Sequence, residues 1–187
     1  MDGSSSSPTP TPAWMNCYSH VFKDLFNPSV IPFDKEDSGA GVQAAQERLL
    51  HDTLEKDYNE VTDSTLKAGD IVVRTGHVGY ATGDGDKISQ FGFPEAILPT
   101  ANRMKVLQDK LKTPGGLSKD EKAELDRLKK AFEEWSDKHS SSENEVSFKI
   151  LNDGRNPGDY KVYRLKGCHS AILKPSPIHT TGGGQCR

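Results

Sequence analysis

One residue near the N-terminus has the position of an activated nucleophile. Cys17 follows Asn16, and the apolar residues after it recur at helical spacing as far as Pro28, which indicates a short helix. Asn16 is a suitable N-cap, so Cys17 occupies the first turn, where unpaired backbone N–H groups and the helix dipole favour a thiolate. The sequence therefore predicts Cys17 as a nucleophile.

A histidine that could act as the base lies in the segment 69–92. Two runs of β-branched residues, followed by the turn sequence Gly-Asp-Gly-Asp at 83–86, predict three antiparallel strands here. A four-residue loop over 83–86 pairs Gln90 with Gly79, which places both on one face with His77. A histidine, a glycine and a polar amide on one face indicate a site. The alternative is that His77 is a hydrogen-bonded structural residue.

The residue that orients this histidine is either Gln90 or Ser89. The side-chain carbonyl of Gln90 can accept the imidazole N–H and so fix the tautomer. A slip of the hairpin by one residue would present Ser89 instead. Cys168 and His169 are a weaker second pair, because adjacent residues of a strand point to opposite faces.

The order and surroundings of these residues resemble the NlpC-type branch of the papain-like cysteine hydrolases. The matching stretches span about half of the chain and are Asn16-Cys17, Gly69-Asp70-Ile71-Val72, His77-Val78-Gly79-Tyr80 and Ser89-Gln90. Family members often have Asp-Cys-Ser-Gly around the nucleophile, where this chain has Asn16-Cys17-Tyr18-Ser19, and a histidine as the third residue, where it has Gln90.

The resemblance implies an α+β, papain-like NlpC-type fold with the nucleophile helix packed on an antiparallel sheet, which we expect to have about five strands. It implies a cysteine amidase or endopeptidase that cleaves the stem peptides of bacterial peptidoglycan through catalytic Cys17, His77 and Gln90. The reaction requires no cofactor and no metal. The Cys17 backbone N–H is the expected oxyanion donor, and Asn16 or Tyr18 is the candidate for the second.

The resemblance also suggests a biological setting. The first residues lack the basic and apolar parts of a signal peptide, so we expect secretion or injection by another route. Family members of one domain are often effectors injected into competitors, for instance by a type VI secretion system. The expected partners are then an immunity protein and a carrier of the secretion machinery, and the expected site of action is the target-cell periplasm.

Two other functions stay open on the sequence. A glutamine deamidase or transglutaminase-like toxin would use the same three residues on a protein substrate. A non-catalytic binding module would use Cys17 as a small buried hydrophobic residue and His77 as a structural polar group. The resemblance favours the hydrolase of peptidoglycan.

Composition excludes several classes of partner. The 187 residues, 33% of them hydrophobic and 27% charged, suffice for one domain with a modest core. The formal net charge of −3 provides no basic field for nucleic acid or an anionic membrane. No run approaches the roughly 20 apolar residues of a membrane-spanning helix. We therefore expect neither nucleic acid nor membrane as a partner, and a monomer, because docked helices leave no long apolar stripe.

The three cysteines of the chain are an odd and sparse set. Cys17, Cys168 and Cys186 argue against a disulfide framework, and they include no Cys-x-x-Cys pair of a zinc site. One free, reactive thiol is the simplest interpretation.

The chain divides into three parts. Residues 1–13 form a low-complexity linker rich in serine, threonine and proline, residues 14–174 the hydrolase domain, and residues 175–187 a flexible tail. Within the domain we expect a helix over 41–58 and strands over 145–151 and 160–165.

A charged helical hairpin at 101–140 interrupts this domain. Its second helix opens with the capping-box sequence Ser118-Lys119-Asp120-Glu121. The hairpin is either a solvated outer face or a functional wall or arm that contacts the substrate or a partner.

Overall fold

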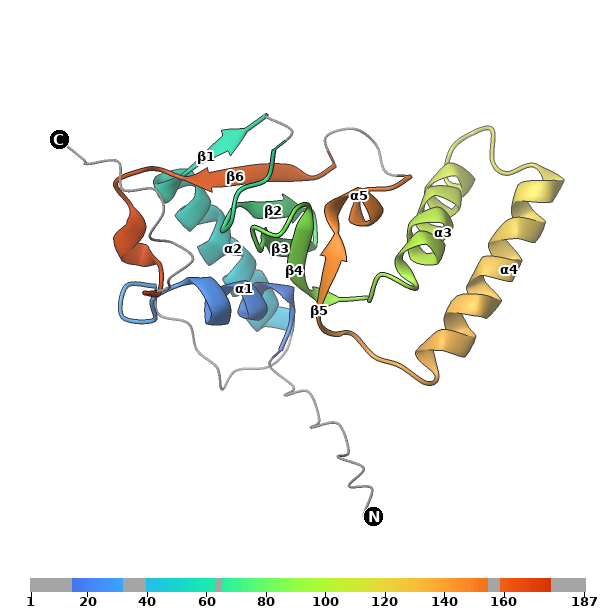
Figure 1. The fold of residues 1–187 in the computed structure, drawn as a ribbon. Helices are drawn as coiled ribbons and strands as arrows, with labels where there is room; N and C mark the ends of the chain where they lie inside the picture. Colours follow the sequence, from blue (N-terminus) through green and yellow to red (C-terminus); the bar gives the residue numbers. More distant parts are fainter. Residues whose placement is uncertain (1–14, 32–39, 63–64, 155–158, 176–187) are drawn as a thin grey trace, which may run out of the picture.

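The computed structural model describes residues 15–31, 40–62, 65–154 and 159–175. Over these residues the chain is α+β, with a six-stranded antiparallel sheet and several helices (Figure 1). The predicted linker 1–13 and positions 176–187 of the predicted tail lie outside the described residues. Among the described helices none has the length and apolar character needed to cross a membrane.

The sheet places His77 and Gln90 on inner strands. Its spatial order is β1 (Tyr58–Val61), β6 (Lys161–Leu165), β2 (Ile71–Arg74), β3 (His77–Ala81), β4 (Lys87–Gly92) and β5 (Ser142–Ser147). All neighbouring strands are antiparallel. The strands β2, β3 and β4 follow one another through short turns, so residues close in sequence meet directly at the centre of the sheet.

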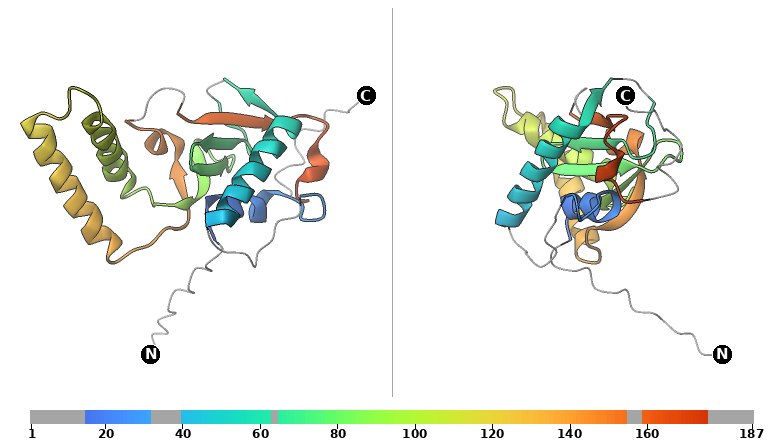
Figure 2. Two further views of the ribbon diagram at one scale, coloured as in Figure 1. Left: turned by 180° about the vertical axis from the view of Figure 1, so that it is seen from behind. Right: turned by 90° about the vertical axis from the view of Figure 1, so that its left-hand side faces the viewer.

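Helices cover the two faces of this sheet unequally. The helices α1 (Cys17–Leu25) and α2 (Ala40–Asp57) pack on one face, against a core that includes Ile71, Val73 and Val78 (Figure 2). The opposite face buries Val72, Ala81 and Ile88, which pack with Leu98, Val146, Leu151 and Tyr160. This alternation along β2 is what a strand buried on both faces requires.

The inserted hairpin has a small core of its own. The helices α3 (Leu98–Leu111) and α4 (Lys119–Ser136) bury Leu107, Leu117 and Leu125 between them. Figure 1 and Figure 2 show the two helices extending beyond the β5 edge of the sheet, away from β1. The Ser118 side chain accepts from Glu121 N–H and the Glu121 side chain accepts from Ser118 N–H, which confirms the predicted capping box.

Several sequence predictions differ from the structure at their ends. The sheet has six strands rather than about five, because Tyr58 leaves the predicted helix 41–58 and begins β1 against β6. The predicted strand 145–151 is wrong in its second half, where Phe148–Leu151 forms the short helix α5. Asp86 causes this change, because its backbone carbonyl accepts from Phe148 N–H and its carboxylate accepts from the Ser147 hydroxyl.

Candidate active site

Cys17 is the first residue of α1, as the sequence predicts. The Asn16 side chain accepts from the Ser19 N–H at 2.9 Å, and the Ser19 hydroxyl accepts from the Asn16 N–H at 2.7 Å, which is a complete capping box. The Asn16 amide also donates to Gln46 Oε1 on α2 at 2.8 Å. Two helices therefore fix the residue before the thiol, and Cys17 is the free cysteine of the described residues.

His77 begins β3 and meets Gln90 across the hairpin. The register pairs Gly79 with Gln90, which confirms the predicted loop and places His77 and Gln90 on one face. His77 Nε2 lies 2.7 Å from Gln90 Oε1. Both side chains are buried, with exposed fractions of 8% and 1%, so little water competes for this hydrogen bond.

Asn144 on β5 determines which way the Gln90 amide points. The Gln90 side-chain nitrogen donates to the Phe93 carbonyl at 2.8 Å and to Asn144 Oδ1 at 3.2 Å. The Asn144 nitrogen in turn donates to the carbonyls of Gly92 and Ser142. Because carbonyl oxygens only accept, this network turns Gln90 Oε1 toward the histidine.

The orientation of Gln90 fixes the tautomer of His77. An amide oxygen accepts, so the hydrogen of the 2.7 Å contact belongs to His77 Nε2. In the neutral ring Nδ1 is then the basic nitrogen. Gly92 leaves room for this ring, since a Cβ there would lie 3.2 Å from His77 Cε1. The arrangement holds an imidazole whose Nδ1 can take a proton.

Cys17 and His77 line the same cavity, which has a volume of about 440 Å³. One side of it comes from α1 and the sheet, with Asn16, Arg74 and Gln90. The other side comes from the hairpin, with apolar Met104 and Phe132 beside polar residues. The backbone of Val78, the residue after His77, lowers the pKa of the Cys17 thiol.

The Cys17 thiol is not a ready thiolate at the helix start. Burial raises the pKa of the Cys17 thiol, and this effect exceeds the lowering by the N–H groups of Val78, Tyr18 and Cys17 and by the Arg74 charge. The sequence prediction that the helix start lowers the pKa of this thiol is therefore wrong in its net direction. A reaction at this sulfur needs a base, and His77 lines the same cavity.

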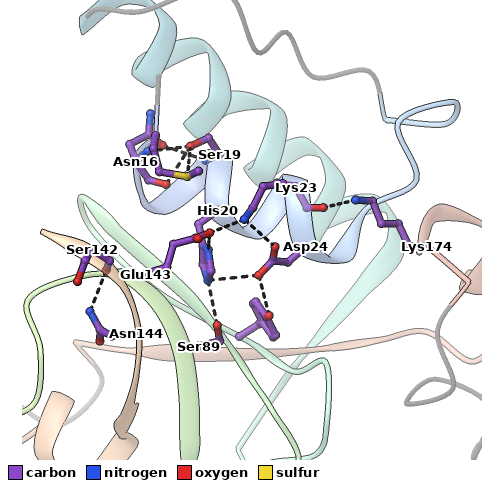
Figure 3. Close-up of polar contacts among 12 residues, drawn as sticks. Asn16, Ser19, His20, Lys23, Asp24, Ser89, Ser142, Glu143, Asn144 and Lys174 are labelled. Carbon is purple, nitrogen blue, oxygen red and sulfur yellow. Dashed lines mark hydrogen bonds and ion pairs between the residues drawn. The ribbon is translucent and has the colours of Figure 1, made fainter. Parts of the chain in front are cut away.

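A second polar network holds α1 against β4 and β5 (Figure 3). His20 is buried, and its two ring nitrogens lie 2.9 Å from Glu143 Oε1 and 3.0 Å from Ser89 Oγ. Lys23 contacts Glu143 and also Asp24, which accepts from the Tyr80 hydroxyl. These contacts fix the helix that begins with Cys17.

The same network has one feature of a metal site. Ligand atoms of His20, Asp24 and Glu143 lie within 4.8 Å of one another. The Lys23 ammonium contacts both carboxylates and already supplies the positive charge that they require. These ion pairs account for the charges of the cluster, and they hold α1 against β5.

Two of the three remaining candidates, Ser89 and Tyr18, have other positions than the sequence suggested. Ser89 faces His20 rather than His77, so the alternative register is wrong. Tyr18 is buried in the core beneath α1, with 1% of its surface exposed, and it is not among the described residues that line the cavity. Asn16 does line the cavity, but its amide nitrogen donates to Gln46.

The second cysteine–histidine pair has other partners. Cys168 is disulfide-bonded, so the sequence argument against disulfides does not hold for this residue. His169 Nδ1 lies 2.6 Å from Asp57 Oδ1. Neither residue lines the cavity that contains Cys17, so the structure gives this pair no place in the candidate site.

Sequence reasoning missed Asn144 and Arg74. Asn144 pairs directly with Gln90, but the predicted strand began one residue after it, at Glu145. Arg74 pairs with His77 in the β2–β3 hairpin, which the strand pattern could have indicated. Their side-chain roles depend on contacts with Gln90 on β4 and with Tyr160, which precedes β6.

Comparison with known proteins adds no relative. No family model, no curated protein and no solved structure matches this chain.

Proposed function

We propose that this protein is a cysteine amidase or endopeptidase that cleaves amide bonds in peptidoglycan stem peptides. The 2.7 Å contact between His77 Nε2 and Gln90 Oε1 is the observation that best supports it. This contact makes Nδ1 the basic nitrogen of an imidazole that lines the same cavity as Cys17. The order of the sequence motifs supports a papain-like, NlpC-type arrangement, with a nucleophile at a helix start and a base on a strand. The substrate class follows from that resemblance.

The proposed reaction proceeds in two steps at Cys17. His77 Nδ1 takes the thiol proton while the sulfur attacks the amide carbonyl, and the resulting imidazolium gives that proton to the leaving amine. Water, deprotonated by His77, then attacks the thioester and releases the acid and the thiol. Gln90 keeps the ring in position throughout, because its oxygen accepts the Nε2 hydrogen in both protonation states.

The start of α1 is suited to the developing oxyanion. The first N–H groups of a helix have no carbonyl partner four residues earlier, and the Cys17 N–H is one of them. A donor already in place stabilises the oxyanion without reorganisation. The Cys17 N–H is therefore the first oxyanion donor in this proposal.

Digestion of purified peptidoglycan tests the proposal. The wild-type protein should release stem fragments with a new amine and a new carboxylate, detected by mass spectrometry. Cys17→Ala and His77→Ala should abolish release while melting at temperatures near that of the wild type. His169→Ala, which alters a histidine outside the cavity, is the matched control and should keep full activity.

The same assay separates the alternatives. No fragment from the wall, together with conversion of a protein glutamine to glutamate, would favour a deamidase at the same thiol. No reaction with either substrate, and no effect of Cys17→Ala on any measured property except alkylation, would favour a binding module. The proposed setting of an injected effector requires growth inhibition of a target cell that depends on Cys17.

A further inference from the structure

Arg74 lies beside the candidate catalytic pair and has no assigned role. It is the last residue of β2 and pairs with His77 across a turn of two residues, Thr75 and Gly76. Gly76 has a φ of 75°, the left-handed conformation that such a tight turn requires. Arg74, His77 and Cys17 all line the same cavity.

Neighbouring groups hold the Arg74 guanidinium in place. Its Nε donates to the Tyr160 hydroxyl at 2.9 Å, and its central carbon lies 5.6 Å from the centre of the Tyr160 ring. Its Nη1 donates to the Thr75 carbonyl at 3.0 Å. Tyr160 is itself buried and packs edge-on against Phe148 and His77. The cation is therefore oriented by a tyrosine rather than neutralised by an acid.

The cavity contains no acid to balance this charge. Among the described residues Arg74 takes part in no ion pair. No aspartate or glutamate is found among the described residues that line the cavity. The second cation there, Lys105, already pairs with Asp109 at 2.8 Å. Arg74 also lines a second pocket with Glu47 and Asp159, but in the described part of the chain no ion pair joins it to either acid, so its charge remains available to the candidate active site.

We propose that Arg74 binds a carboxylate of the substrate, so that the acyl part of the cleaved amide has an anionic group next to the carbonyl that Cys17 attacks. The guanidinium has five donors in a planar fork that matches a carboxylate, and two of these are used by Tyr160 and Thr75. The remaining donors can take the carboxylate. This inference rests on the proposed function of Cys17 and adds the charge of its substrate.

Alkylation of Cys17 by two small reagents tests this subsite without any knowledge of the natural substrate. Iodoacetate and iodoacetamide react alike: the thiolate forms a carbon–sulfur bond and iodide leaves. They differ in that iodoacetate has a carboxylate where iodoacetamide has a neutral amide. Both need the thiolate, so the ratio of their rates cancels any effect on the pKa of Cys17.

The folded protein should favour the anionic reagent. Relative to the chain unfolded in urea, we expect the ratio of iodoacetate to iodoacetamide rates to rise roughly tenfold, which corresponds to about 1.4 kcal/mol, since a guanidinium binds a carboxylate more strongly than a neutral amide. Arg74→Gln should lower the ratio most of the way back to that of the unfolded chain, and Arg74→Lys should lower it only in part. Lys161→Gln removes a cation on the neighbouring β6 that pairs with Glu60 and does not line this cavity, so it should leave the ratio unchanged.

Two results would overturn the inference. One is a ratio in the folded protein equal to that of the unfolded chain. The other is a raised ratio that Arg74→Gln leaves unchanged, since the His77 imidazolium would then be the source of the attraction. If Arg74→Gln fails to fold, the ratio is compared between the folded wild type and folded Arg74→Lys. A ratio that is raised in the wild type and lower in Arg74→Lys supports the inference, and an equal ratio in both contradicts it. Absence of peptidoglycan cleavage contradicts the proposed function and does not alter this ratio.

Discussion

Glu143 and Asn144 are neighbours on β5, and their side chains lie on opposite faces of the sheet. One contacts the helix that begins with Cys17, and the other contacts Gln90, the partner of His77. Glu143 contacts His20 and Lys23 on the helix that begins with Cys17. Asn144 accepts from Gln90, which orients His77. Because successive side chains of a strand alternate, one edge strand contacts both the helix that begins with Cys17 and the hydrogen-bond partner of His77. The relative position of sulfur and imidazole therefore depends on how β5 docks against β4.

Gln90 should be the residue that orients the base. Gln90→Ala removes the acceptor of His77 Nε2–H, and we expect at least a tenfold loss of kcat, part of the roughly 10²–10⁴-fold that a general base contributes. Steady-state hydrolysis of stem peptides measures it. Ser89→Ala should keep kcat, because Ser89 contacts His20. The reverse pattern would show that Ser89 has the role proposed for Gln90.

Asn144 should act only through Gln90. Asn144→Ala removes one acceptor of the Gln90 amide, and a hydrogen bond worth about 0.5–1.5 kcal/mol corresponds to a loss of kcat of roughly twofold to thirteenfold. KM should change little, since Asn144 is not among the described residues of the cavity. Asn59→Ala on the edge strand β1 is the control. A loss of kcat in Asn144→Ala as large as in His77→Ala would contradict this role.

The hairpin should contribute to the choice of substrate. Phe132 lines the cavity from α4 and packs against Phe93 with ring centres 5.2 Å apart. Phe132→Ala should lower kcat/KM for stem peptides roughly tenfold, the effect of about 1.4 kcal/mol of lost binding, and leave hydrolysis of a small ester unchanged. Lys129→Ala, on the exposed side of the same helix, is the control. Unchanged rates on both substrates would support the solvated outer face.

Cys17 should react slowly with alkylating reagents near neutral pH. Burial raises the pKa of its thiol, so at a given pH less thiolate is present in the folded protein than in the unfolded chain. The iodoacetamide rate should therefore rise with pH beyond the point where an ordinary thiol, with a pKa of about 8.5, has levelled off. Measurement from about pH 6 to pH 10, with the urea-unfolded chain as reference, checks this. A plateau of reactivity below the ordinary pKa would indicate a preformed ion pair with His77.

The Glu143 network should stabilise the fold above acidic pH. Hydrogen bonds from Lys23 and then His20 hold the pKa of Glu143 below its usual range. The ionised Glu143 therefore adds to the free energy of unfolding above the usual pKa of a glutamate, and this addition is lost as the pH falls through the lowered pKa. Glu143 is 44% exposed, so Glu143→Gln should cost about 1 kcal/mol or less near neutral pH. Urea unfolding at neutral and at acidic pH should show the difference shrinking with acidification. Glu145→Gln, also exposed on β5, should show no such change.

The sequence by itself determined the local parts of the site. The cap at Asn16, the strand order around His77 and the pairing of Gln90 with Gly79 follow from short-range patterns, because capping and hairpin register depend on a few adjacent residues. The two hairpin helices were also predictable, since apolar residues at helical spacing mark both and a capping box marks the second.

Tertiary structure alone decided which of these residues meet. Burial of Cys17 by contacts distant in sequence reverses the net effect expected from the helix start. Asn144 and Arg74 gain their roles from partners distant in sequence, Gln90 on β4 and Tyr160, which precedes β6. No local pattern encodes such contacts, because they form only when the sheet assembles and excludes water from the groups it joins.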